Sequence, residues 1–425
     1  MQVKVTKLPY NEVLKRKTKK AKPAKKPNIF FRTLLKLVSL PDLMAARFTC
    51  TKKGLEKLDK KQPCFILMNH SSFIDLEIVT SVFYPRPLNI VATWDAMLGK
   101  NWLMRQIGCM PTIKFMASAK LIRDMQYCLK KLKTSVVMYP EVGYTFDGTT
   151  TTLPESLGKC VKLLGVPLVS VITHGAHLRQ PLFNELRKRN VFVNAEVEYL
   201  LSPDQIKQMS PDEINRVILE KFSFNEYRYQ SENGVRIDHP ERAVGLNRIL
   251  YKCPHCLAEG QTEGKGATLI CKACGKEYEL TETGEMKALD GETEIESIPQ
   301  WYAWERKCVK EELEGGRYEL NADVDIMMMV DTSGVYDIGS GKLTHGENGF
   351  RLVSDDGQLD FTQSPTASYS VNSDLYWYEM GDVVCVGDLS AQYYCFPKNT
   401  GDIVVKARLA AEELFKLKKT SGKVN

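Results

Sequence analysis

Short apolar runs alternate with helical patterns through residues 64–200 of the chain. The run at 64–68 is continuous and apolar, as expected for a strand that is buried on both faces. Apolar positions recur at helical spacing in 117–132, and 155–164 repeats that pattern. The alternation predicts an α/β domain with a mixed, mostly parallel sheet. Its expected strands are 64–68, 88–93, 135–139, 168–173 and 191–199.

A different pattern fills the C-terminal part. A helix is predicted at 298–314, with Trp301 and Trp304 on one side, which suits either core packing or an interfacial aromatic belt. From 318 onward, Val-, Tyr- and Phe-rich strands alternate with Gly, Asp and Ser turns, and a helix at 403–419 follows. This order resembles a pleckstrin-homology-like or GRAM-like barrel closed by a helix, a fold-level analogy that leaves lipid head groups and proteins open as ligands. The expected strands are 323–330, 334–338, 341–345, 349–353, 358–362, 375–380, 383–387 and 392–396.

The N-terminal segment is strongly basic. Residues 1–36 hold twelve Lys and Arg against one acid, Glu12, so this end carries +11 of a chain whose net charge is +6. Residues 1–27 lack a hydrophobic period, and we expect no regular structure there. Residues 28–49 predict amphipathic helices at a membrane interface: one that Pro41 ends, and a short one over 42–48.

A basic segment of this kind predicts an anionic partner. Each basic residue near an anionic lipid leaflet contributes about 1 kcal/mol, so a membrane surface with anionic lipids is the expected partner. A core helix with a solvated charged edge is the alternative for 28–49. Nucleic acid is not expected as a partner, because no aromatic residues for base stacking are interleaved with these lysines.

Composition and hydropathy bear on the compartment. The chain has 425 residues, 43% hydrophobic and 26% charged, which is ordinary for a soluble protein of several domains. We expect no transmembrane helix, because no apolar run approaches 18 residues, and no secretory signal, because the apolar segment begins only after Asn28. The scattered cysteines favour a reducing compartment. We therefore expect a cytoplasmic protein, peripheral on the inner face of a membrane.

One short stretch carries candidate chemistry. The turn Asn69-His70-Ser71-Ser72 follows the strand at 64–68, and its serines suit N-caps of a helix that begins near Phe73. Asp75 then lies about one helical turn beyond His70, where its carboxylate can orient the imidazole and leave the other ring nitrogen as a base. A capped helix with an incidental histidine is the alternative. Glu141, which follows the strand at 135–139, is expected at the same sheet edge and favours the catalytic interpretation.

Three blocks in order resemble the glycerophosphate acyltransferase superfamily, especially the 1-acylglycerol-3-phosphate acyltransferases. The first, N-H-S-S-F-I-D at 69–75, has the H-x-x-x-x-D pattern. The second, Y-P-E-V-G-Y-T-F-D-G at 139–148, is similar to F-P-E-G-T-R-S-x-x-G, and the third, G-V-P-L-V-S-V at 165–171, is similar to G-V-P-I-V-P-V. The resemblance covers roughly 28–220.

This resemblance implies an O-acyltransferase of phospholipid synthesis. His70 would deprotonate an acceptor hydroxyl that attacks an acyl thioester, with Asp75 orienting the imidazole, and Asn69, Glu141 and Gly143 would belong to the substrate site. Glu141 as a turn-capping carboxylate stays open as an alternative. The implied donor is acyl-CoA or acyl carrier protein, and the implied acceptor is a lysophospholipid, 1-acylglycerol-3-phosphate first. A catalytically weak or inactive lipid-binding scaffold, or an acyltransferase for another lipid acceptor, is the alternative.

The second and intermediate blocks depart from the family pattern. Val142 and Tyr144 replace the family's Gly and Arg, and Tyr cannot grip a phosphate bidentately as Arg does. In the intermediate block Lys114 is the best candidate for the phosphate-binding residue. His174 and His177 follow the strand at 168–173 and are left out of the predicted site, because lone histidines are more often structural.

Two C-x-x-C units predict a metal site. Cys253 and Cys256 precede Cys271 and Cys274 with fourteen residues between the pairs, the spacing of a four-thiolate zinc ribbon. Iron is the alternative metal. The local charges are mixed, so a structural or docking module is favoured over nucleic-acid binding.

The predicted organisation has seven parts. They are a basic tail (1–27), membrane-interface helices (28–49), the acyltransferase domain (50–225), a linker (226–249), the zinc ribbon (250–285), a helical linker (286–316) and the β module (317–425).

Overall fold

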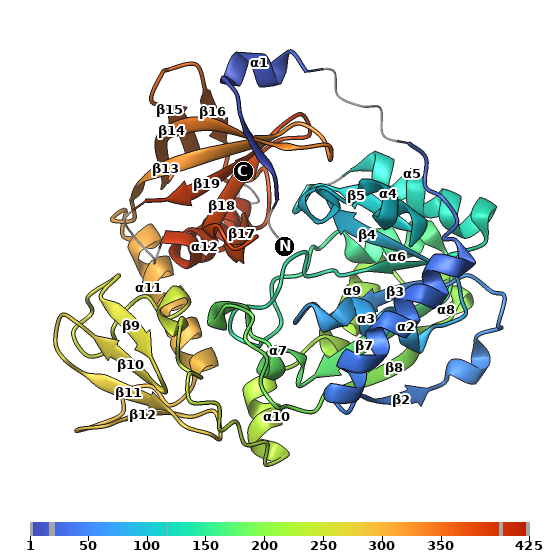
Figure 1. The fold of residues 1–425 in the computed structure, drawn as a ribbon, viewed down its shortest axis with the longest axis horizontal. Helices are drawn as coiled ribbons and strands as arrows, with labels where there is room; N and C mark the ends of the chain where they lie inside the picture. The colour runs from blue at the N-terminus through green and yellow to red at the C-terminus, as the bar shows by residue number, and fades with distance from the viewer. Residues whose placement is uncertain (1–2, 17–21, 117, 399–402, 422–425) are drawn as a thin grey trace. The chain divides into compact units, whose positions relative to one another are not determined.

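The computed structural model describes residues 3–16, 22–116, 118–398 and 403–421, and divides the chain into two compact units (Figure 1). One unit, here called the acyltransferase unit after the domain predicted within it, comprises residues 20–181 and 188–229. The other, here the C-terminal unit, comprises residues 1–19, 182–187 and 230–425. The segment 182–187 therefore leaves the acyltransferase unit and belongs to the C-terminal one.

The acyltransferase unit is built on a seven-stranded mixed sheet. All neighbouring strands are parallel except β7 and β8, which are antiparallel. The mixed, mostly parallel sheet expected from the sequence is thus confirmed. In spatial order the strands are β2 (Thr49–Lys53), β8 (Asn194–Leu201), β7 (Leu168–His174), β3 (Phe65–Met68), β6 (Ser135–Met138), β4 (Leu88–Thr93) and β5 (Cys109–Thr112).

Strand β3 is apolar throughout because both of its faces are covered. Ile66 and Met68 join one hydrophobic core with residues from 43–46 and 74–79, whereas Phe65 and Leu67 join a second core with residues from 125–129, 157–164 and 206–218. The helices of the unit are α2 (Ile29–Ala45), α3 (Ile74–Val82), α4 (Asn101–Gln106), α5 (Ala119–Tyr127), α6 (Leu157–Leu164), α7 (Ala176–Arg179), α8 (Pro203–Gln208), α9 (Pro211–Lys221) and α10 (Glu226–Glu232), which runs past the end of the unit.

Helix α2 differs from its prediction, because it continues through Pro41 to Ala45 as a single helix. The proline removes one backbone hydrogen bond, but the turn beyond it is held by tertiary contacts. Leu43 is buried in the core, and the Asp42 carboxylate accepts hydrogen bonds from Arg179 and Lys188, each 2.8 Å long. Packing therefore outweighs the local helix-breaking tendency.

Two strands of this sheet were not expected from the hydrophobic pattern. Strand β2 is polar and lies at the sheet edge, and β5 lies at the other edge. Neither has the continuous apolar run of a central strand, because an edge strand has fewer neighbouring elements and buries less of its own surface. Within the described part of the chain, we find no helix whose length and apolar character would let it span a bilayer.

The C-terminal unit contains a small antiparallel sheet and a large one (Figure 1). The small sheet has the order β12 (Met286–Ala288), β11 (Glu277–Leu280), β10 (Thr268–Cys271) and β9 (Thr262–Lys265). The large sheet has the order β16 (Asp360–Gln363), β15 (Gly349–Ser354), β14 (Val335–Gly346), β13 (Leu320–Met329), β19 (Gln392–Pro397), β18 (Gly381–Gly387) and β17 (Asn372–Trp377).

Helices α11 (Ile298–Glu314) and α12 (Ile403–Ser421) lie where the sequence predicts them. The two strands expected at 334–338 and 341–345 are one strand, β14, which continues through a bulge at Ile338 and through Gly339, whose φ is 106°. Among the described residues no ladder joins β16 to β17, so the closed barrel stays a prediction.

Residues 1–27 also depart from expectation where they are described. Strand β1 (Val5–Lys7) pairs in parallel with β14, and α1 (Tyr10–Leu14) follows it with Val13 buried. The expectation of an unstructured segment is therefore wrong for these residues. Strand pairing within the C-terminal unit supplies order that the lysine-rich sequence does not signal. Residues 1–2 and 17–21 lie outside the described part of this segment.

Candidate active site

The turn that carries His70 leaves the middle of the parallel sheet. Strand β3 lies between β7 and β6 and ends at Met68. Asn69, which is fully buried, then fastens the chain to β7: its Oδ1 accepts hydrogen bonds from the amide (2.8 Å) and hydroxyl (3.0 Å) of Thr173, and its Nδ2 donates to the Thr173 carbonyl. The backbone of His70 is therefore placed at the carboxyl edge of the sheet, where α/β folds bind ligands.

Asp75 fixes the orientation of the His70 ring. His70 Nδ1 lies 3.0 Å from Asp75 Oδ2, and the same oxygen accepts the amide N–H groups of Ser71 (2.7 Å) and Ser72 (3.0 Å). Because Oδ2 already accepts two amide hydrogens, the shared proton belongs to Nδ1. His70 Nε2 is then left with its lone pair, which is the state required of a general base.

The same contacts correct the predicted helix start. Helix α3 begins at Ile74, and no serine side chain caps it. Instead, the Asp75 side chain accepts hydrogen bonds from the amides of Ser71 and Ser72. The serine side chains were expected to cap the helix, whereas here a side chain of the helix caps the turn. The turn is held by the carboxylate that also orients the imidazole.

Two tyrosines flank the His70 ring. Tyr139 stacks on it with ring centroids 4.2 Å apart, and Tyr144 lies 4.1 Å away at an angle of 33°. Phe73 lies 5.4 Å from Tyr144 and is exposed. The His70 side chain itself is 20% exposed. Aromatic surface, rather than a cationic side chain, therefore lies next to the candidate base.

Glu141 holds the backbone of the site. It is fully buried, its Oε2 accepts the His70 amide (2.8 Å), and its Oε1 accepts the Thr151 amide (3.0 Å). The Thr145 amide in turn donates to the His70 carbonyl (3.1 Å). These bonds join the loop 139–151 to the turn of His70. For Glu141, as for Asn69, they favour a positioning role over the substrate contact that the resemblance implies.

Val142 and Gly143 lie in the same loop. Val142 has a φ of 64°, so this β-branched residue adopts the left-handed conformation that suits the glycine of the family pattern. At Gly143 an added Cβ would meet no described atom within 4 Å. Space for one added carbon is thus available at Gly143, next to Tyr144 in the chain.

Lys114 is brought to the same sheet edge but not to His70. It follows β5 and lies 3.5 Å from Asp95, which follows β4. Strand β5 is the third neighbour of β3, so their axes are roughly 14 Å apart. Its side chain is only 10% exposed. The phosphate-binding role of Lys114 therefore stays a prediction, for a lysine that is paired with Asp95 and lies away from His70.

His174, which the sequence-based site leaves out, forms a second histidine–carboxylate pair. His174 Nδ1 lies 3.0 Å from Glu226 Oε1, and Glu226 Oε2 accepts the Gly175 amide (2.6 Å). Glu226 is fully buried, and its pKa is raised chiefly by burial and further by the charge of Asp75, against the opposing bonds to His174 and Gly175. Its 52-residue separation from His174 leaves no local signal.

His177 is also at this edge but is fully buried. Burial lowers its pKa to about 3, and the charge of Arg189 adds to the effect. It is therefore a neutral imidazole at physiological pH, in agreement with the structural role expected from the sequence.

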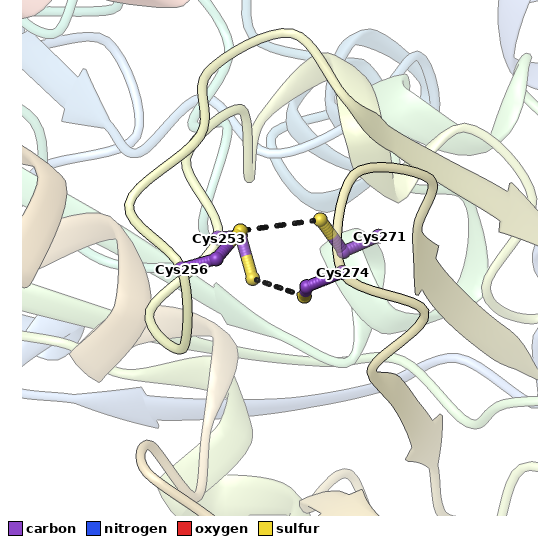
Figure 2. A group of neighbouring side chains, drawn as sticks. All are labelled: Cys253, Cys256, Cys271 and Cys274. Atoms are coloured by element: carbon purple, nitrogen blue, oxygen red, sulfur yellow. Dashed lines mark hydrogen bonds between the residues drawn. The ribbon is translucent and has the colours of Figure 1, made fainter.

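The four predicted metal-ligand cysteines are brought together in the C-terminal unit (Figure 2). The Sγ atoms of Cys253 and Cys274 are 3.8 Å apart, and those of Cys256 and Cys271 are 3.7 Å apart. Zn–S bonds of about 2.3 Å in a tetrahedron put neighbouring sulfurs about 3.8 Å apart, so the arrangement fits such an ion. His255 is turned to Glu294, 2.8 Å from its Oε1.

Comparison with known proteins agrees with the motifs. The family model described as Acyltransferase matches residues 49–174. Among solved structures, the 1-acyl-sn-glycerophosphate (LPA) acyltransferase PlsC from Thermotoga maritima is similar at 16% identity and a TM-score of 0.35, over 45% of this chain and 76% of that one. No curated protein matches the chain. Residues 49–174 therefore form a domain of the acyltransferase superfamily, and both His70 and Asp75 lie within it.

Proposed function

We propose that this protein is a peripheral membrane enzyme that transfers a fatty acyl group from an acyl thioester to the hydroxyl of a lysophospholipid. The observation that carries the proposal is the His70–Asp75 pair: Nδ1 is held 3.0 Å from a buried carboxylate, inside a domain of the acyltransferase superfamily. Such a pair leaves Nε2 as a base for an alcohol, which is a poor nucleophile at neutral pH.

In the proposed reaction His70 Nε2 takes the proton of the acceptor hydroxyl. The oxygen attacks the thioester carbonyl, and the buried Asp75 carboxylate stabilises the imidazolium that forms. Acyl-CoA and the thioester of acyl carrier protein are both possible donors. No acyl-enzyme intermediate is needed. The Ser71 and Ser72 amides hold Asp75, and their hydroxyls bond to Asn69 and Gln180.

The acceptor is proposed from what surrounds His70. The resemblance puts 1-acylglycerol-3-phosphate first, but Tyr144 stands where that family has Arg, and Lys114 is paired with Asp95. These two observations favour the second candidate, a lysolipid whose head group is not a terminal phosphomonoester. Product analysis by mass spectrometry, with the full chain, acyl-CoA and a mixed lysolipid pool, decides between them. A lipid-binding scaffold without turnover would give no acylated product from any acceptor.

Helix α2 supports the proposed membrane contact. An apolar stripe along it is exposed, including Phe30 (65%), Val38 and Met44 (73%), and Trp102 of α4 extends it through Phe31, with ring centroids 5.3 Å apart. Arg32 and Lys36 instead turn back, toward the Pro85 carbonyl and the Tyr84 ring. An exposed apolar stripe on a helix suits insertion at the level of lipid head groups.

Vesicle flotation tests this contact. The triple variant Phe30→Gln, Leu34→Gln, Val38→Gln should lose binding to vesicles that contain anionic lipid. The double variant Leu163→Gln, Leu219→Gln removes similarly exposed leucines elsewhere in the same unit and should bind as the wild type does. Removing residues 1–49 would be a poor test, because Leu43 and Ala46 are buried in the core. Unchanged flotation of the triple variant would exclude α2 from the interface.

We further propose that the four cysteines hold a structural zinc ion. The S···S distances support it, and such an ion would join the turn at Cys253–Cys256 to the end of β10 at Cys271. Elemental analysis of the purified full chain should find one zinc per chain. Cys256→Ser should lose it and lower the thermal midpoint of the C-terminal unit, whereas Cys308→Ser, outside the cluster, should not. One iron per chain instead of zinc would identify the alternative metal.

A further inference from the structure

Two neighbouring helices of the acyltransferase unit expose unpaired cations. Arg123 lies on α5, Lys130 lies in the helical turn Cys128–Leu132 that continues α5, and Lys159 lies on α6. All three residues are exposed, and none forms an ion pair with a residue that the structure describes. Three positive charges on these helices are therefore available to a partner.

The charge of this region is a local excess. Segments 119–133 and 155–164 hold seven Lys and Arg against two acids, which gives +5. One of the acids, Asp124, forms an ion pair with Lys120. Residues 37–425 as a whole carry −5, the difference between the net charge of +6 and the +11 of the N-terminal segment. The two helices thus form a positive surface on an otherwise acidic body, which attracts a negatively charged partner.

Apolar side chains are exposed next to these cations. Tyr127 on α5 is 42% exposed, and Leu163 on α6 is 59% exposed. The two helices are joined at this surface, because Gln126 Nε2 donates to the Leu163 carbonyl (3.3 Å). An apolar centre with a polar rim is the usual composition of a protein–protein interface. We call this surface the cationic face; its residues are Arg123, Tyr127, Lys130, Lys159 and Leu163.

The cationic face lies on the side of the sheet opposite to α2. Met125 of α5 and Leu157 of α6 belong to the core that Phe65 and Leu67 join. Leu43 of α2 belongs to the other core. Neighbouring residues of a strand point to opposite faces of a sheet, so α5 and α6 cover one face of β3 and α2 covers the other. A protein can therefore reach the cationic face while α2 lies on a membrane.

The cationic face is carried by helices that start at the edge of His70. Helix α5 follows the carboxyl end of β5, and α6 precedes the amino end of β7, so both helices run from the carboxyl edge of the parallel strands to their amino edge. Arg123 and Lys159 lie in the first half of their helical segments. A partner on this face therefore binds elements that begin where the acyl transfer is proposed.

We propose that the cationic face docks acyl carrier protein, a small acidic protein that carries the acyl group as a thioester on a flexible pantetheine arm. The inference rests on the proposed function and identifies its donor. Carboxylates of the carrier would pair with the three cations, and its apolar side chains would pack on Tyr127 and Leu163. The arm would then cross the carboxyl edge to His70. Acyl transfer breaks the carbon–sulfur bond and leaves the thiol of the arm, which receives the proton of the acceptor hydroxyl through His70.

Two other anionic partners fit the cationic face less well. The phosphates of CoA belong to one compact molecule, whereas Arg123 and Lys130 are roughly 10 Å apart along the helix axis. An anionic membrane would have to approach the side of the sheet opposite to the exposed apolar stripe of α2. A protein with a broad acidic surface matches both the spread of the charges and the apolar side chains beside them.

Isothermal titration of the full chain with acyl carrier protein whose arm bears no acyl group measures docking without turnover. In a triple charge-reversal variant of the cationic face, the dissociation constant should rise about 20-fold, because three attractive contacts become repulsive. The substitutions are Arg123→Glu, Lys130→Glu and Lys159→Glu. All three positions are exposed, so the variant should melt near the wild type.

A control variant applies the same change of charge elsewhere in the acyltransferase unit. Its substitutions are Lys57→Glu, Lys60→Glu and Lys61→Glu, at exposed positions that precede β3. It should bind the carrier as the wild type does. The double variant Tyr127→Ser, Leu163→Ser removes the apolar part of the face and should weaken binding without changing its dependence on salt.

Kinetics with two donors of the same acyl chain links docking to turnover. The charge-reversal variant of the cationic face should raise the KM for the thioester of acyl carrier protein by about the same 20-fold. Its KM for acyl-CoA, and its kcat with either donor, should stay near the wild-type values, because the substitutions are distant from His70 in the chain and leave the base intact.

The outcomes separate the two proposals. An unchanged dissociation constant in the charge-reversal variant, or an equal loss in the control variant, would overturn the docking role and leave the function in place. A wild type that uses acyl-CoA but does not bind the carrier would do the same. Loss of vesicle flotation in the charge-reversal variant would assign the face to the membrane instead. If the wild type acylated no lysolipid from either donor, the proposed function would fail, whereas carrier binding in the titration would still support the docking face.

Discussion

The His70 and His174 pairs have the same distance between Nδ1 and the carboxylate oxygen and similar burial, but they arise in different ways. Asp75 lies five residues from His70, on the first turn of α3, so a single strand–turn–helix segment builds the pair. Glu226 comes from α10, 52 residues after His174, and reaches it only because the chain returns to the sheet edge. A local pair can be recognised as a motif, whereas a distant pair of the same geometry cannot.

Removing His70 should have the largest effect. His70→Ala deletes the base, and we expect kcat with acyl-CoA to fall roughly 10³-fold, because positioned general bases contribute about 10² to 10⁴. Single-turnover acyl transfer measures it. His239→Ala, at a partly exposed histidine of the C-terminal unit, is the control and should keep wild-type turnover. Turnover that survived His70→Ala would show that the base lies elsewhere.

Replacing each carboxylate by its amide sharpens the comparison. Asp75→Asn removes the charge that stabilises the His70 imidazolium, and kcat should fall about 10²-fold. Glu226→Gln keeps an N–H that can donate to His174 Nδ1 and an oxygen for the Gly175 amide, so the loss should be smaller, about threefold. Steady-state kinetics of both variants with acyl-CoA measures this ratio. Equal losses would mean that turnover depends on the Glu226 carboxylate as strongly as on that of Asp75.

Tyr144 distinguishes the surroundings of His70 from those of His174. Tyr144→Arg restores a side chain that can donate two hydrogen bonds to a phosphate. The KM for a lysolipid with a terminal phosphomonoester should therefore fall about tenfold relative to the KM for a lysophosphatidylcholine. Steady-state kinetics with the two acceptors measures this ratio. The control is Tyr144→Phe, which keeps the ring beside His70 and should leave the ratio of the two KM values unchanged. If Tyr144→Arg also left that ratio unchanged, position 144 would not face the acceptor head group.

The smallest expected effect concerns the loop 139–151, which is joined to the turn of His70. Val142 has a φ of 64°, which costs a β-branched residue about 1–2 kcal/mol. Val142→Gly relieves that strain, but glycine also raises the conformational entropy of the unfolded chain, which offsets part of the gain. The free energy of unfolding should therefore rise by about 0.5–1 kcal/mol. Chemical denaturation of the full chain measures it. Val142→Ala keeps a Cβ and should gain less; an equal gain from alanine would locate the strain in the branched side chain.

Much of the acyltransferase unit could be predicted because its central strands are apolar on both faces. The run at 64–68 predicts β3, and the apolar positions at helical spacing in 117–132 and 155–164 predict α5 and α6. Prediction failed where packing overrides local preference. Pro41 lies inside α2 because Leu43 and Asp42 are held beyond it, and β2 is a polar edge strand with no hydrophobic signal.

The residues of the candidate site show the same difference between local sequence signals and tertiary packing. The His70–Asp75 pair and the four cysteines were predictable, because their spacing in the chain is short and each type of group has a specific chemistry. Glu141 was expected near a substrate, but the structure makes it a fully buried acceptor for two backbone amides. Its role follows from which amides it meets, and those lie in segments far apart in the chain.

By itself, then, the sequence determined the α/β alternation, the His70–Asp75 pair and the thiolate cluster, since each depends on residues a few positions apart. Only the tertiary structure decided that β7 lies beside β3, that His174 and Glu226 meet there, and that Lys114 lies three strands from His70. Strand order is set by packing between distant segments, and the distribution of protons between buried groups depends on which amides each oxygen accepts. Neither property is encoded in local spacing.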